Sequence, residues 1–334
     1  MGLMETIFNR AKAEPQRVAF PEGQDETMMR AAAEAAARGI AIPVLVGDEA
    51  ELRALATERG IDVDVFEYSD TATEDGWDEL VARFTALPVC QLKEKGVRRR
   101  LSRPLERSLI LEAIGDVDIT FAGRIATTGE VIAAGQAFVG LAEGIDVVSS
   151  MGIFDIPGYE GPEGNLLGFG DSAVCTNPTP TQLASIAISC CDTVAALCGW
   201  EPRCALLSYS TCGSSTSELT EKVVAARDIA NERRPDLAID GEFQLDAAIN
   251  PEVAARKVGR ESAVAGCANI IIWPDINVGN VGVKLVQQFA HADAYGPMLQ
   301  GFAKIVCDCS RGAGVSEILG NIAISCVRAQ ALKA

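Results

Sequence analysis

Three segments of the chain combine glycine with hydroxyl, amide or cationic side chains, a mixture suited to holding a phosphate group. They are residues 208–216, 274–280 and 308–314. Each segment follows a short apolar run and precedes an amphipathic one, so each is expected at the junction of a strand and a helix. Backbone N–H groups at such junctions bind anions readily. Together the three segments predict a ligand that carries phosphate.

The third segment holds the side chains with the most specific chemistry. Arg311 can bind a phosphate through two parallel hydrogen bonds. Its neighbour Ser310 can donate to the same anion or to an oxyanion that develops during a reaction. Glu317 is expected on the first turns of the helix that follows.

The other two segments supply further candidate ligand contacts, which are Ser208, Ser210, Thr211, Asn280 and Lys284. Asn280 is expected to cap a helix over residues 281–290, and Lys284 to bring positive charge near its N-terminus. Each segment taken alone also fits an ordinary loop that caps a helix. The prediction of a site therefore depends on all three.

The chain is strongly acidic, with 29 Lys and Arg against 46 Asp and Glu and a formal net charge of −17. This charge disfavours nucleic acid and anionic membranes as partners. It also means that a phosphate must be attracted by local positive charge and by backbone N–H groups. We therefore expect small-molecule substrates.

The cysteines and the single histidine, His291, do not form a metal-binding pattern. None of the eleven cysteines has C-x-x-C spacing, so no zinc site is predicted, and buried thiols that act as small apolar residues are expected. The N-terminal residues lack the apolar stretch of a signal peptide, and no apolar run reaches the roughly 18 residues of a membrane span. These features predict a soluble, cytoplasmic protein.

Short apolar runs alternate with amphipathic ones along the chain, which is typical of βαβ units and a mainly parallel sheet. Strands are expected at residues 17–20, 42–46, 63–68, 116–121, 204–209, 237–239, 269–273 and 304–307. Helices are expected at residues 25–38, 49–59, 128–139, 217–233, 281–290, 315–330 and from Pro180 onwards. The Gly- and Pro-rich residues 151–170 interrupt the alternation and are interpreted as a crossover between domains. A length of 334 residues also favours two domains.

The motifs along the chain resemble those of the phosphate acetyltransferase family. The matching motifs occur in the family's order over nearly the whole length. They are Pro21-Glu22-Gly23 with Asp25-Glu26, Leu207 to Thr211, Asp240-Gly241 with Gln244 and Asp246-Ala247, Pro274-Asp275 with Asn277, Gly279, Asn280 and Lys284, Gly296-Pro297 with Gln300-Gly301, and Ser310-Arg311-Gly312.

The resemblance implies an α/β fold with two three-layer domains, mainly parallel sheets and an interdomain cleft. On this basis the first domain comprises residues 1–155 plus 298–334 and is closed by the C-terminal segment, and the second comprises residues 156–297. It also implies a homodimer that uses no metal and no prosthetic group.

The resemblance further implies the interconversion of a short-chain acyl-CoA and phosphate with acyl phosphate and CoA, most simply with acetyl. Ser310 then stabilises the tetrahedral intermediate, Arg311 holds the phosphate, and Glu317 stands where the family carries an aspartate base. Thr127 and Thr128 match a Thr-Thr-Gly motif and are expected to contact substrate. Glu317 adds one methylene to the base, which changes its reach.

Several positions depart from the family pattern. Ala126 replaces a histidine, Ala133 and Gln288 replace arginines, and Ser172 replaces a cysteine. A further family arginine falls at Leu92 or Lys93, depending on the alignment. Two hypotheses stay open: an acyltransferase with an altered acyl preference, and a regulatory or structural member that binds acyl-CoA or a phosphate ligand without turnover.

Two features of the sequence could compensate for the missing arginines. Arg124, close to Ala126, could replace a lost arginine, and the basic run from Arg98 to Arg103 could hold CoA phosphates, although a solvated helix face is the simpler interpretation of that run. A dinucleotide-dependent dehydrogenase is a further alternative, but residues 21–24 stand where its G-x-G-x-x-G motif would be.

Overall fold

The computed structural model describes residues 2–333, which fold as two compact units. The first unit runs up to Gly140 and resumes at Phe302, and the second spans Leu141–Gly301. The sequence placed these boundaries near residues 155 and 297. They differ because residues 149–155 and 298–300 belong to strands that pair with each other in the second unit.

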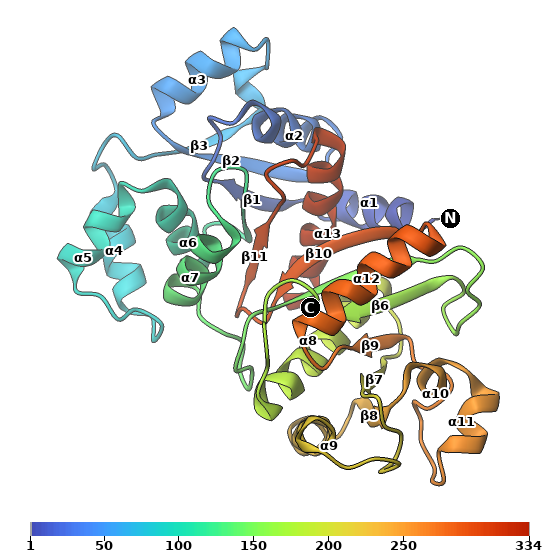
Figure 1. Cartoon of the computed structure of the whole chain (residues 1–334). Helices are drawn as coiled ribbons and strands as arrows, with labels where there is room; N and C mark the ends of the chain where they lie inside the picture. The colour runs from blue at the N-terminus through green and yellow to red at the C-terminus, as the bar shows by residue number, and fades with distance from the viewer. Residues whose placement is uncertain (1, 334) are drawn as a thin grey trace. The chain divides into compact units, whose positions relative to one another are not determined.

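The first unit is built on five parallel strands in the order β11-β4-β1-β2-β3 (Figure 1). The strands are β1 (Gln16–Phe20), β2 (Ala41–Gly47), β3 (Glu67–Asp70), β4 (Ile119–Ala122) and β11 (Ile305–Asp308). β11 comes from the end of the chain and pairs with β4 along its full length. Because neighbouring parallel strands end at the same edge of a sheet, the loops after β1, β4 and β11 emerge side by side.

Helices cover both faces of this sheet. They are α1 (Leu3–Ala13), α2 (Glu26–Ala37), α3 (Glu49–Glu58), α4 (Trp77–Thr85), α5 (Glu94–Leu101), α6 (Pro104–Ile114), α7 (Thr128–Phe138) and α13 (Val315–Lys333). α1, α2 and α13 pack together on one side, and α6 and α7 pack on the other (Figure 1). The strand expected at residues 63–68 was wrong, because Asp62 caps a 3₁₀ turn, η1 (Val63–Val65), and β3 begins only after it.

The second unit contains a six-stranded sheet in the order β10-β5-β6-β9-β7-β8. Its strands are β5 (Ser149–Asp155), β6 (Leu166–Gly170), β7 (Arg203–Leu207), β8 (Ala238–Phe243), β9 (Ile270–Ile272) and β10 (Asp293–Gln300). β5 pairs antiparallel with both β6 and β10, and the other pairs are parallel. The expected α/β class with mainly parallel sheets is confirmed.

Residues 151–170 form two strands rather than a crossover, so that prediction was wrong. The glycines that suggested a loop are required by close packing. A Cβ on Gly170 would lie 2.4 Å from Cys190 Sγ, and one on Gly168 would lie 2.7 Å from Met151 Cε. Here glycine marks a close approach of a helix and a side chain to the sheet.

Five helices belong to the second unit: α8 (Pro180–Cys198), α9 (Glu218–Arg233), α10 (Leu245–Ile249), α11 (Pro251–Lys257) and α12 (Ile276–Ala290). Among residues 2–333, α8 is the one helix long and apolar enough by composition to cross a membrane. Most of α8 is buried against α9 and the sheet of its own unit. Its apolar character is therefore that of a core helix.

All eleven cysteines lie in the described part of the chain, and none of them is in a disulfide. Six are buried, and Cys212 alone is exposed. Burial raises the pKa of the Cys326 thiol to about 12 and that of Cys307 to about 11. These thiols are neutral, weakly reactive core residues, as the sequence predicted.

The core of the first unit contains a buried carboxyl group, that of Glu112 on α6. Glu112 is fully buried, and neither carboxyl oxygen has a hydrogen-bond partner among residues 2–333. Burial raises the pKa of Glu112 well above its ordinary value. The folded protein therefore retains a proton that the unfolded chain releases at lower pH.

We expect Glu112→Gln to remove a pH-dependent loss of stability. A raised folded-state pKa gives stability that is complete below the unfolded pKa of about 4.3 and declines as pH rises towards the folded pKa. The wild type should thus lose stability relative to the variant by about 1.4 kcal/mol per pH unit in that window. Urea unfolding of both proteins from pH 4.5 to pH 8 measures this difference, and parallel curves would show that Glu112 ionises normally.

Candidate active site

The loops that follow β1, β4 and β11 form a connected group at one edge of the first sheet. Glu22, in the loop after β1, is almost fully buried and holds the loop after β4. Its carboxylate accepts hydrogen bonds from the backbone N–H groups of Arg124 at 2.7 Å and Ala126 at 2.8 Å. Glu22 therefore fixes the start of α7 relative to β1.

Arg124 joins all three loops. Its guanidinium pairs with the Asp25 carboxylate at 3.1 Å and donates to the carbonyl oxygens of Arg311 and, at 3.3 Å, of Ala313. These partners leave Arg124 poorly placed to bind a ligand phosphate. Its hydrogen bonds instead hold the loop after β11.

Ser310 and Arg311 are exposed on that loop. Within residues 2–333 the guanidinium of Arg311 makes no hydrogen bond, and its positive charge lies close enough to Asp308 and Glu130 to influence their ionisation. Ser310 Oγ accepts a hydrogen bond from Gly312 N at 3.2 Å, which leaves its proton free to donate. A free guanidinium beside a free hydroxyl donor suits a phosphate group next to a carbonyl oxygen that gains negative charge.

Glu317 lies three residues into α13, which begins at Val315. It is exposed, and no residue from 2 to 333 donates a hydrogen bond or forms an ion pair with its carboxylate. The chain therefore leaves this carboxylate accessible to a ligand. The structure places it on the helix that the loop of Ser310 and Arg311 leads into.

Thr127 and Thr128 use their hydroxyl groups within the protein. Thr127 caps α7: its Oγ1 accepts from Glu130 N at 3.2 Å, and its backbone N–H donates to the Glu130 carboxylate at 2.7 Å. That backbone hydrogen bond lowers the pKa of Glu130. Thr128 Oγ1 donates to Asp308 Oδ2 at 2.6 Å, which ties α7 to the end of β11. Both hydroxyl groups are thus engaged within the first unit, whereas the sequence suggested contacts with substrate.

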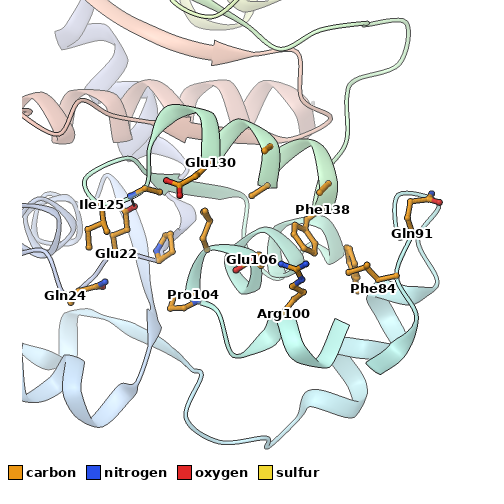
Figure 2. Close-up of a pocket in the computed structure, with 17 residues that line it drawn as sticks. Glu22, Gln24, Phe84, Gln91, Arg100, Pro104, Glu106, Ile125, Glu130 and Phe138 are labelled. Atoms are coloured by element: carbon orange, nitrogen blue, oxygen red, sulfur yellow. Dashed lines mark hydrogen bonds and ion pairs between the residues drawn. The ribbon is translucent and has the colours of Figure 1, made fainter. Parts of the chain in front are cut away.

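A cavity of about 760 Å³ lies beside these loops, within the first unit. Figure 2 shows Glu22, Ile125 and Glu130 at one end of it and Phe84, Phe138 and Gln91 at the other. Ala126 and Ala133, which depart from the family pattern, both line it. The Arg100 guanidinium, on α5, is paired with Glu106 at 2.9 Å.

In the second unit, Ser210 and Thr211 are buried in the loop between β7 and α9. Ser210 Oγ donates to Glu242 Oε1 at 2.9 Å, and Thr211 Oγ1 accepts from Gln244 N at 2.9 Å. These bonds attach the loop to the end of β8. The two hydroxyl groups thus shape the loop, whereas the sequence suggested direct contacts with a ligand.

Ser208 differs from its neighbours because it lines a pocket of about 370 Å³ in the second unit. The same pocket is lined by Tyr209, Trp273 and Lys222. Lys222 was missed by sequence reasoning. Its amine donates to Pro274 O at 2.8 Å and to Asn177 Oδ1 at 3.1 Å, and burial lowers its pKa.

The structure changes the expected roles of Asn280 and Lys284. α12 begins at Ile276. Asp275 caps it, because its carboxylate accepts hydrogen bonds from the backbone N–H groups of Asn277 and Val278. Asn280 therefore lies inside the helix, where its Nδ2 donates to Ser172 O at 3.2 Å. Lys284 is exposed in the third turn, too far along α12 to benefit from the helix N-terminus.

The candidate residues thus divide between the two units, and each group is coherent within its own unit. Thr127, Thr128, Ser310, Arg311 and Glu317 belong to the first, and Ser208, Ser210, Thr211, Asn280 and Lys284 to the second. The positioning role of Arg124 and Glu22 was not foreseen. The one available signal was the occurrence of Glu22 and Asp25 directly after a strand.

Comparison with known proteins gives the same picture along the whole chain. The family model described as "Phosphate acetyl/butaryl transferase" matches residues 2–326. A phosphate acetyltransferase from Clostridium acetobutylicum is 40% identical over 335 residues, which cover 99% of this chain and 99% of that protein. One from Acetivibrio thermocellus is 37% identical over the full length of both. The crystal structure of a phosphotransacetylase from Streptococcus pyogenes superposes with a TM-score of 0.89 at 31% identity, covering 99% of this chain and 98% of the other.

Proposed function

Because the chain belongs to the phosphate acetyl/butyryl transferase family, we propose that it is a phosphate acetyltransferase that interconverts acetyl-CoA and phosphate with acetyl phosphate and CoA. The observation that carries this proposal is the pair formed by Ser310 and the uncommitted guanidinium of Arg311, on a loop held by Arg124. A chain that only bound a ligand as a structural subunit would have less need of a free donor beside a free cation.

In the direction of acetyl-CoA synthesis, Glu317 takes the proton of the CoA thiol, and the resulting thiolate attacks the carbonyl carbon of acetyl phosphate. A C–S bond forms, the C–O bond to phosphate breaks, and phosphate leaves. Ser310 donates to the carbonyl oxygen as negative charge develops there, and Arg311 holds the phosphate through attack and departure. A free thiol is only a few per cent ionised at pH 7, so a base within reach accelerates the step.

We assign Ser208 a contact with substrate, supported by its place in the wall of the 370 Å³ pocket. Asn280 and Lys284 remain candidate contacts on α12, and Thr127, Thr128, Ser210 and Thr211 are assigned to positioning. The ligands of these residues are then the small-molecule substrates of the proposed reaction, a CoA thioester and phosphate or acyl phosphate.

The direct test is a thioester assay with acetyl phosphate and CoA. We expect absorbance at the thioester wavelength to rise with enzyme concentration, and arsenate or excess phosphate to reverse the signal. If calorimetry shows that CoA binds but the assay shows no turnover, the chain is instead a family member that binds its ligand without catalysing the reaction.

We also propose that the protein is a homodimer. α12 exposes an apolar stripe, formed by Val281, Leu285 and Phe289, of which Phe289 is 81% exposed. Apolar stripes of this kind are typical of surfaces that pair with another protein. We propose that a second copy covers this stripe.

The dimer is tested by Phe289→Lys. We expect the wild type to have twice the 35.2 kDa mass of one chain in light scattering, and the variant to shift towards a single chain. Leu332→Lys is the matched control, because Leu332 is 60% exposed on α13 in the other unit. A wild type that runs as a single chain at micromolar concentration would exclude the dimer.

We place the protein in the cytoplasm. The support is chemical: eleven cysteines without a disulfide suit a reducing compartment. Fractionation of the native host, followed by immunoblotting, tests this placement.

A further inference from the structure

The pocket of about 370 Å³ in the second unit has one amine in its wall, that of Lys222 on α9. Most of the other lining side chains are apolar or aromatic, among them Leu219, Leu245 and Trp273. Ser208, which we assign to a contact with substrate, lines the same pocket. Pockets of this volume enclose small ligands. A ligand held here therefore lies beside a primary amine.

The amine of Lys222 is held at two points. It donates to Pro274 O, just after β9, at 2.8 Å and to Asn177 Oδ1, between β6 and α8, at 3.1 Å. A neutral amine has two N–H groups and a lone pair, so it can keep both bonds while the lone pair stays free. Lys257 and Lys333 each pair with a carboxylate at 2.7 Å, whereas Lys222 forms no ion pair with a carboxylate from residue 2 to residue 333. No direct contact with a carboxylate holds it as an ammonium ion.

The surroundings of Lys222 favour the neutral amine. Partial burial lowers its pKa, although Asp275, which lines the pocket and caps α12, and Cys175 act in the opposite direction. A lysine that loses solvent in an apolar pocket is a better nucleophile near neutral pH than an exposed lysine. The pocket thus combines space for a small ligand with a nucleophilic amine in its wall.

We propose that Lys222 is an acylation site, modified by the activated acetyl group that the enzyme handles, either acetyl phosphate or acetyl-CoA. The inference rests on the proposed function, which supplies both donors. The lone pair of the neutral amine attacks the carbonyl carbon of acetyl phosphate, and a C–N bond forms. The C–O bond to phosphate breaks, phosphate leaves with the bonding electrons, and the surplus proton on nitrogen passes to the leaving phosphate or to water. With acetyl-CoA the same amide forms, and the CoA thiolate leaves instead.

Acetylation changes what Lys222 can hold. The amide nitrogen keeps one N–H group and no charge, so it can make only one of the bonds to Pro274 and Asn177. One of the two loops then loses its attachment to α9, and the acetyl group occupies space in the pocket beside Ser208. Modification should therefore lower activity as the acetyl donor accumulates.

The test is peptide mass spectrometry of the purified protein after incubation with acetyl phosphate alone or with acetyl-CoA alone. We expect Lys222 to be acetylated at least about 10-fold faster than the exposed Lys95 and Lys257, because a donor bound beside an amine reacts faster than one met from solution. The rate at Lys222 should also saturate as donor concentration rises. The donor that labels Lys222 faster is the one that occupies the pocket.

Variants separate the modification from the charge. Lys222→Arg keeps the charge and the donors but is not acetylated, so preincubation with donor should inhibit the wild type in proportion to its labelling and leave this variant at its starting rate. Lys257→Arg, in the same unit, is the control and should be inhibited like the wild type.

Acetylation of Lys222 that is no faster than that of Lys257, or that stays linear in donor concentration, would overturn the proposal. This labelling result does not depend on any variant being stable. The donor is added as a reagent, so it is also obtained if the thioester assay shows no turnover. Failure of the proposed function is thus distinguished from failure of this inference.

Discussion

Arg311→Ala is expected to lower kcat/KM for acetyl phosphate by about 10²–10³-fold, the loss typical of removing one charge-stabilising donor from a transition state. The guanidinium has no partner among residues 2–333, so its removal breaks no internal hydrogen bond. The thermal midpoint should therefore change little. Initial rates at varied acetyl phosphate, with circular dichroism of the same samples, measure both effects.

Arg311→Lys separates charge from geometry. Lysine keeps the charge but loses the planar fork that binds two phosphate oxygens, so an intermediate rate is expected. Arg256→Ala is the control, because Arg256 is an exposed arginine on α11 in the other unit. A rate for Arg311→Ala within about twofold of wild type would remove Arg311 from the proposed mechanism.

Arg124→Met should lower kcat by about 100-fold, the loss that follows a displacement of reacting groups by about 1 Å. Arg124 does not face the substrate in this proposal, but it donates to the carbonyl oxygens of Arg311 and Ala313 and pairs with Asp25. Without it the loop loses these two bonds, and among residues 2–333 only the bonds at its start, from Thr128 to Asp308 and from Cys309 to Ala122, still hold it. Full kinetics with each substrate varied in turn should show the loss mainly in kcat, since the binding groups are still present.

A purely structural role for Arg124 is distinguished by conservative replacement. Asp25→Asn weakens the ion pair but keeps the two bonds to the loop, so kcat should fall less than in Arg124→Met. Arg30→Met is the control, because it removes an exposed arginine from the neighbouring α2. If kcat falls in each variant only in proportion to the fall in its thermal midpoint, Arg124 supports folding and not the reaction.

Much of the fold was predictable because βα periodicity is a local property. The helix over residues 217–233 and the strand over 42–46 occur within one residue of their expected bounds. The prediction of a crossover at residues 151–170 was wrong because glycine occurs both in loops and where a strand packs closely against its neighbours. Gly168 and Gly170 allow close packing against Met151 and Cys190, and Cys190 lies far away in sequence. No local pattern distinguishes such glycines from those of a loop.

The site was predictable in its loops but not in the roles of their side chains. Hydroxyl-rich segments after strands indicated where a phosphate could bind. Whether a hydroxyl faces a ligand depends on partners that are distant in sequence. Ser210 is bound by Glu242, 32 residues away, and the loop of Arg311 by Arg124, 187 residues away. Such pairs follow from strand order, which the sequence pattern did not determine.

The pairing of β11 with β4 also has a consequence for the order of events during synthesis. The second unit is continuous from Leu141 to Gly301, so a ribosome has delivered all of it before it begins β11. The first sheet lacks its edge strand until residues 305–308 emerge. Since domains fold as units during translation, we expect the second unit to form early and the loop of Ser310 and Arg311 to be assembled in one of the last steps. A nascent chain that stalls before β11 would thus have a folded second unit and no capacity for acyl transfer.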